Sequence, residues 1–170
     1  MLKPQDVVIL LKIAAKVEKP WAQGTIALEL GMSASEVNAG IKRLLKSGLA
    51  RKKESRVHPV KAAMVEFLRH GIKYVFPIER GEPTRGIATS YAADIFKGIL
   101  GQGDSIPVWP CAEGQDKGYS VQPLYKSVPH AVSQDAILYD LLAIVDVLRS
   151  GNARDSLVAV KTLNKYLDEL

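Results

Sequence analysis

The chain has one cysteine, no long apolar run and no repeated or low-complexity segment, and each of these shortages excludes a class of protein. Because Cys111 is the only cysteine, no internal disulfide can form, and we expect the protein to work in the reducing cytoplasm. Charged residues interrupt every apolar stretch, MLKPQDVVILLKIAAKVEK at the N-terminus included, before it reaches the ~20 residues of a membrane span. The sequence therefore predicts neither a membrane protein nor a signal peptide, and neither a fibrous nor a disordered chain.

The composition is that of an ordinary globular protein, but its charge is unevenly distributed. The chain has 170 residues, of which 47% are hydrophobic and 24% charged, and this length suits one domain or two small ones. Residues 1–61 carry twelve Lys or Arg against five Asp or Glu, a net charge of +7. Residues 62–170 carry eleven against thirteen, a net charge of −2. This asymmetry indicates a polyanion-binding N-terminal part on a nearly neutral body.

The spacing of apolar residues predicts an α+β fold that is mostly helical. Helices are expected over residues 4–20, 25–30, 33–47, 59–70, 91–100 and 133–150, and from 152 onward. Short strands are expected at 49–51, 72–77 and 118–125, and a loop rich in Gly, Pro, Ser and Thr at 78–90. We expect an N-terminal domain over 1–77 and a C-terminal region over 78–170 that ends in an antiparallel helical hairpin.

Several helix ends carry specific signals. Ser33 and Glu36 form an S-x-x-E capping box, in which each side chain satisfies a free N–H of the first turn. Gly48 is placed to end that helix in the left-handed conformation. Ser133 is expected to cap the first helix of the C-terminal hairpin, and Gly151 to end it.

Residues 23–49 contain a pattern of small, apolar and turn-forming residues. It reads Ala27-x-x-Leu30-Gly31-Met32-Ser33-x-x-x-Val37-x-x-x-Ile41-x-x-Leu44, followed by Gly48-Leu49. A small residue at 27 lets two helices approach closely, and glycine at 31 supplies the positive φ of the turn. The pattern resembles the helix-turn-helix of winged-helix transcription regulators, of the MarR type and related bacterial families. The resemblance covers about the first 75 residues and implies that this domain binds double-stranded DNA.

In that arrangement one face of the 33–47 helix enters the major groove. We expect Asn38 to pair with adenine and Arg43 with guanine, each contributing about 1–3 kcal/mol of discrimination. Basic residues nearby and in the following hairpin are expected to hold phosphates. The predicted DNA-binding residues are Ser33, Ser35, Asn38, Ala39, Lys42, Arg43, Lys46, Arg51, Lys52, Lys53 and Arg56. The alternative is that this charge is only a solvated face.

The expected wing departs from the family pattern. After ARKKESR the chain enters a predicted helix, and the returning strand is expected only at Ile72–Pro77. This departure puts the usual minor-groove role of the wing in doubt.

Other constellations carry no recognisable chemistry. Three histidines and Cys111 lack the paired spacing of a metal site, and we predict no catalytic set, no metal and no cofactor. Asp135, Asp140 and Asp146 are expected on a solvated helix face. Polar and aromatic residues in 78–130 are candidates for lining an effector pocket or a partner surface, the alternative being a small loop-rich region packed on the hairpin. These candidates are Arg80, Thr84, Arg85, Thr89, Ser90, Trp109, Tyr119 and Tyr125.

The sequence thus predicts a cytoplasmic, bacterial regulator of transcription that binds double-stranded DNA as a homodimer. The alternative is a protein-interaction module, such as an antitoxin or the regulatory partner of a separately encoded enzyme. Apolar residues outside the main helical stripes indicate two possible dimer surfaces, one on the first helix and one on the C-terminal hairpin. The alternative is that the hairpin residues cover residues 78–130 within one chain. These apolar residues are Leu10, Leu11 and Ile13 in the first helix, and Ile144, Val147 and Val158 in the hairpin.

Overall fold

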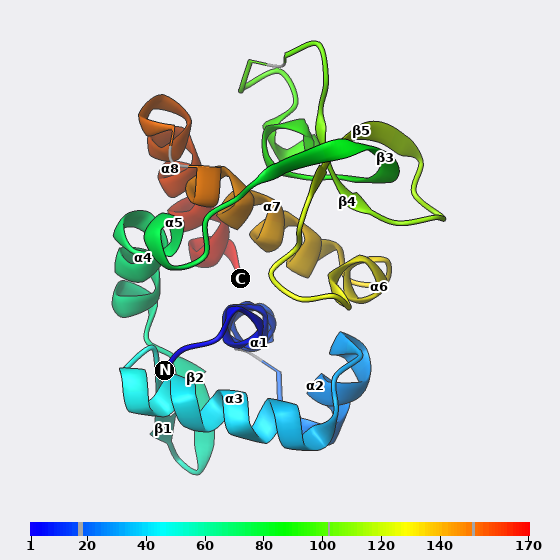
Figure 1. The fold of residues 1–170 in the computed structure, drawn as a ribbon. Helices are drawn as coiled ribbons and strands as arrows, with labels where there is room; N and C mark the ends of the chain where they lie inside the picture. The colour runs from blue at the N-terminus through cyan, green and yellow to red at the C-terminus, as the bar shows by residue number, and fades with distance from the viewer. Residues whose placement is uncertain (17–18, 102, 151) are drawn as a thin grey trace.

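The computed structural model describes residues 1–16, 19–101, 103–150 and 152–170, and it confirms an α+β fold with more helix than strand (Figure 1). The N-terminal elements are α1 (Pro4–Ala15), α2 (Gln23–Leu30), α3 (Ala34–Ser47), β1 (Ala50–Lys53) and β2 (Arg56–Pro59). The predicted capping box is present, since Ser33 Oγ accepts a hydrogen bond from the Glu36 N–H, and Glu36 accepts one from the Ser33 N–H. Gly31, at the turn between α2 and α3, has a φ of 64°.

Helix α1 lies at the centre of the molecule. It packs on α2, α3 and β2 on one side and on α7 on the other, as Figure 1 shows with α1 seen end-on. Val7, Ile9 and Leu11 are all 0% exposed, and a helix that is apolar all round belongs in a core. Leu10 and Ile13 are also buried, so the expectation that α1 presents a dimer surface is wrong.

Strands β1 and β2 form an antiparallel hairpin in which Ala50 pairs with Pro59 and Lys53 with Arg56. The turn between them consists of Glu54 and Ser55, both at positive φ, as a two-residue hairpin turn of this hand requires. The returning strand is therefore β2, and the expectation of a strand at residues 72–77 is wrong.

Residues 72–75 are helical, and residues 76 and 77 follow without a strand. Helix α4 (Lys61–His70) is followed by the single turn α5 (Ile72–Val75). Ile72 is fully buried, and Phe76, four residues later, also packs against the core. This four-residue spacing suits a helical turn, whereas a strand would place Tyr74 and Phe76 on the same face as Ile72. Tyr74 is instead 76% exposed.

The C-terminal region contains a small closed barrel. It is built from β3 (Arg80–Ala88), β4 (Pro107–Pro110) and β5 (Asp116–Val121), and β3 pairs antiparallel with both others while β4 and β5 run parallel. The loop expected at 78–90 is thus largely a strand. Glycine is required at position 86, because a Cβ there would collide with the Trp109 carbonyl. Pro83 follows a shift in the register between β3 and β5. Two 3₁₀ turns, η1 (Ser90–Ala92) and η2 (Asp94–Phe96), replace the expected helix at 91–100.

The chain ends in α6 (Val128–Val132), α7 (Ala136–Ser150) and α8 (Ala153–Glu169), of which α7 and α8 pack on each other. Ser133 is not the cap of α7, because α6 reaches residue 132 and the Asp135 carboxylate accepts the Leu138 N–H at 2.9 Å. Asn152 caps α8 through the Asp155 N–H. The expected helix end at Gly151 lies outside the described residues.

The apolar residues outside the stripe of α7 are buried within the chain. Ile144 is 0% and Val147 1% exposed, and Val158 on α8 is half-buried. They cannot form the dimer surface expected of them, so the homodimer remains a prediction with no surface assigned. One hydrophobic core contains residues from both sides of position 77, and the predicted domain boundary there also remains a prediction. Among the described helices, none is both long and apolar enough to cross a membrane.

Candidate nucleic-acid interface

Helix α3 has one buried and one exposed face. Its apolar residues Val37, Ile41 and Leu44 are at most 3% exposed and belong to the core that α1 and α2 share. A polar and basic set lies on the opposite face. The exposed residues of this set are Ser35, Asn38, Lys42 and Lys46, with the half-buried Ala39 beside them. Most of the side chains predicted to enter the groove therefore do lie on one solvent-facing surface.

Arg43 does not lie free on that surface. Its Nε and Nη2 donate to the two carboxylate oxygens of Asp6 at 2.7 and 2.8 Å, and Asp6 is 0% exposed. The hydrogen bonds to Asp6 raise the pKa of the Arg43 guanidinium. The pairing of Arg43 with guanine remains a prediction, which this ion pair opposes because Nε and Nη2 hold α3 to α1. Nothing in the sequence pattern connects residues 6 and 43.

The β1–β2 hairpin carries further basic residues and lies beside the C-terminal half of α3, which packs on β1 (Figure 1). Arg51, Lys53 and Arg56 share one face, because Lys53 and Arg56 are cross-strand partners and Arg51 is two residues from Lys53. Lys52 is on the opposite face, across from the buried Val57. All four basic side chains are exposed.

Two acidic residues beside α1 are engaged within the chain. Lys12, only 3% exposed, lies 2.7 Å from Glu29 on α2 and 2.5 Å from Asp135 at the start of α7. Burial opposes the charge on Lys12, but its hydrogen bonds to Asp135 and Glu29 outweigh this and raise its pKa. Lys16 also pairs with Glu29. The expectation that Asp135 is simply solvated is wrong, because Asp135 links α7 to α1.

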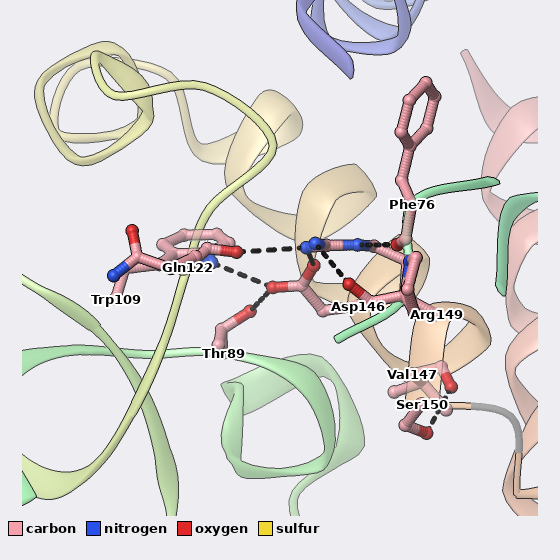
Figure 2. Close-up of polar contacts among 9 residues, drawn as sticks. Phe76, Thr89, Trp109, Gln122, Asp146, Val147, Arg149 and Ser150 are labelled. Carbon is pink, nitrogen blue, oxygen red and sulfur yellow. Dashed lines mark hydrogen bonds and ion pairs between the residues drawn. The ribbon is translucent and has the colours of Figure 1, made fainter. Parts of the chain in front are cut away.

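Asp146 is the centre of a second internal network, shown in Figure 2. It is 1% exposed and accepts hydrogen bonds from Thr89 Oγ1 and Trp109 Nε1, each at 2.8 Å, and from Arg149 Nη1 at 2.7 Å. Arg149 donates in turn to the Phe76 carbonyl at 2.8 Å. This network fixes the barrel and the preceding chain to α7. Asp146 is therefore not solvated, and Thr89 and Trp109 line no exposed effector surface.

Asp140 is the third of the aspartates that were expected to lie on a solvated helix face, and it also has a partner within the chain. It is half-buried and accepts a hydrogen bond from Tyr166 Oη of α8 at 2.8 Å. It therefore helps to join the two helices of the hairpin.

Four of the remaining effector candidates, Ser90, Tyr119, Thr84 and Arg85, are divided between two hollows. A cavity of about 220 Å³ is lined by Ser90, Tyr91 and Tyr119 together with residues of α7 and α8. Arg80 stacks on the Tyr119 ring at 4.2 Å, and the hydroxyls of Tyr91 and Tyr119 are 3.2 Å apart. Thr84 and Arg85 line a separate hollow on the barrel. The structure does not gather the predicted set into one site.

Sequence reasoning missed one contact to α3. The Tyr125 hydroxyl donates to Glu36 Oε1 at 2.5 Å, and Ser127 Oγ donates to the Leu30 carbonyl at 2.5 Å. This hydrogen bond from Tyr125 lowers the pKa of Glu36. Tyr125 was expected to line an effector pocket, and no sequence signal joins it to a residue almost ninety positions away.

Across the described parts of the chain, no group of three or more His, Cys, Asp and Glu residues is placed to hold a metal ion. Comparison of the sequence with protein-family models and curated proteins, and of the fold with solved structures, gives no match.

Proposed function

We propose that the protein is a regulator of transcription that binds double-stranded DNA through the exposed face of α3. In this proposal α2 and α3 are the helix-turn-helix of a winged-helix domain, and β1 and β2 form its wing. One observation carries the proposal: Asn38, Lys42 and Lys46 lie on one exposed face that continues into a basic hairpin. Asp6 and Glu29 pair with Arg43 and Lys12 within the chain, and Lys42 and Lys46 form no ion pair among the described residues.

Each exposed side chain has a role that its chemistry suits. The Asn38 amide can donate to and accept from an adenine edge, and the Ala39 methyl can contact a thymine methyl. Lys42 and Lys46 are suited to phosphates along the groove, as are Arg51, Lys53 and Arg56, which share one face of the hairpin. Arg43 acts differently, because it orients α3 by holding Asp6.

The first experiment measures binding of the full chain to DNA duplexes selected from random sequence. Asn38→Ala should weaken binding to the preferred site by about 1–3 kcal/mol and relax the preference at one base pair. Asn164→Ala on α8 makes the same chemical change away from α3 and should leave affinity unchanged. Lys53→Ala should weaken binding to all sequences alike, whereas Lys52→Ala, on the opposite face of the hairpin, should weaken it less.

Absence of duplex binding at low salt would contradict the proposal. In that case the exposed face of α3 would be a candidate surface for a protein partner, in line with the alternative function.

A further inference from the structure

A segment of the C-terminal region is fixed against the beginning of α3. Tyr125 bonds Glu36 in the first turn of α3, and Ser127 bonds the last carbonyl of α2. Ser127 also lies against the turn itself, since a Cβ at Gly31 would be 3.3 Å from the Ser127 Cβ. Two separate anchors therefore hold residues 125–127 beside the helix-turn-helix.

Lys126 lies between these two anchors and is exposed. Its Nζ is 6.0 Å from the centre of the Tyr125 ring, and none of the ion pairs among the described residues involves it. Because both neighbours are fixed, Lys126 can move only within the reach of its own side chain. Its charge is thus confined to the surface around the N-terminal end of α3. The hydrogen bonds of Tyr125 and Ser33, and then the Lys126 charge, lower the pKa of Glu36 there, but Lys126 forms no salt bridge among the described residues.

The dimensions of α3 make this position useful to a DNA-binding protein. Its 14 residues span about 21 Å, whereas the major groove is about 12 Å wide. A helix of this length that crosses the groove, instead of lying along it, brings its two ends towards the two flanking phosphate backbones. The hairpin supplies cations beside the C-terminal half of α3, and a matching cation is expected near its N-terminal end.

We propose that Lys126 is this cation and contacts a DNA phosphate beside the N-terminal end of α3. Residues 125–127 then belong to the DNA interface, with Tyr125 as the residue that positions Lys126. This inference rests on the proposed function, which it deepens by adding a phosphate contact from the C-terminal region.

The test measures the salt dependence of binding of the full chain to a short mixed-sequence DNA duplex. Each phosphate contact contributes about 0.9 to the slope of log affinity against log salt concentration. Lys126→Ala should therefore lower the magnitude of this slope by about 0.9. Lys126→Arg keeps the charge and should keep the slope, and Lys165→Ala, an exposed lysine of α8, should leave it unchanged. Thermal unfolding of each variant checks that the fold is retained.

The outcomes separate this inference from the proposed function. A wild-type chain that binds duplex DNA, with a slope that Lys126→Ala leaves unchanged, overturns the role of Lys126 and leaves the proposed function standing. Equal losses in Lys126→Ala and Lys165→Ala also overturn it, because the effect would then be one of total charge. A wild-type chain that binds no duplex DNA overturns both.

Discussion

Helices α3 and α7 have similar sequence patterns and opposite surroundings. Each carries an apolar stripe with polar residues away from it, yet Asn38 and Lys42 of α3 are exposed whereas Asp146 and Arg149 of α7 are buried. The difference arises because the barrel covers the polar side of α7, and no element of the described chain covers that of α3. Periodicity thus identifies a polar face, and the packing of other elements decides whether that face is a surface.

Each of the two helices also carries an arginine that pairs with a buried aspartate. Arg43 of α3 holds the buried Asp6, and Arg149 of α7 holds the buried Asp146. Both pairs join elements together, so an arginine beside a polar face can have a structural role. The exposed lysines of α3 form no such pair among the described residues, and we assign the binding function to them.

The largest effect is expected at the network of α7. Asp146→Ala would leave the Arg149 charge buried without its carboxylate and would remove the acceptor of Thr89 and Trp109. We expect a loss of about 3–5 kcal/mol in the free energy of unfolding, measured by chemical denaturation. The exposed Asp104 is the control, since Asp104→Ala should change stability by no more than about 0.5 kcal/mol. Similar losses in the two variants would show that the network does not hold the barrel.

A smaller effect is expected at the pair that orients α3. Among the described residues, Arg43→Ala leaves the buried Asp6 with only the Lys3 N–H as a partner. It should cost about 3 kcal/mol, because Arg43 itself is partly exposed. Base preference should be unchanged, which distinguishes this role from direct pairing with guanine. The measurements are denaturation and sequence selection on the same variant. A stable variant with relaxed specificity at one base pair would instead restore Arg43 as a reader of bases.

The next effect is at the turn that the C-terminal segment covers. Gly31 and Gly48 both have positive φ, but only a Cβ at Gly31 would approach another residue, Ser127. Gly48→Ala should cost about 1 kcal/mol from backbone strain alone, and Gly31→Ala about 2 kcal/mol because Ser127 must also shift. Thermal and chemical unfolding compare the two. Equal costs would show that Ser127 does not press on the turn.

The last effect is a loss of stability confined to alkaline pH. Burial, with Asp94, Asp140 and Asp116 nearby, raises the pKa of Tyr139 to about 12, and its hydroxyl donates to the Ala88 carbonyl. Between the ordinary tyrosine pKa of about 10 and this value, the unfolded chain loses the phenol proton while the folded chain keeps it. The free energy of unfolding should therefore fall as the pH rises through this range. In Tyr139→Phe the free energy of unfolding should fall less steeply with pH. Identical slopes in the variant and the wild type would contradict the assignment of this pH dependence to Tyr139.

The sequence predicted those features that depend on neighbouring residues. The capping box at Ser33, the turn at Gly31 and the basic hairpin after α3 each rest on contacts within a few positions, and the structure contains all three. The exposed polar face of α3 follows from helical periodicity in the same way.

The missed features depend on contacts between distant segments. The strand β3 contains glycine and proline, which usually interrupt strands, and its close approach to β4 explains the glycine at 86. The partners of Arg43 and Tyr125 lie 37 and 89 positions away, so no local pattern could show that one residue is engaged and the other touches α3. Burial of α1 and α7 likewise depends on the complete fold.

The most direct test of the account compares two lysine pairs with the same helical spacing. Lys42 and Lys46 lie exposed on α3, and Lys161 and Lys165 lie exposed on α8. In a salt series with duplex DNA, the double variant Lys42→Ala/Lys46→Ala should lower the magnitude of the salt slope by about 1.8, since each lysine contributes about 0.9. The double variant Lys161→Ala/Lys165→Ala should leave the slope unchanged. Equal changes in the two variants, or none in either, would contradict the assignment of DNA binding to the exposed face of α3.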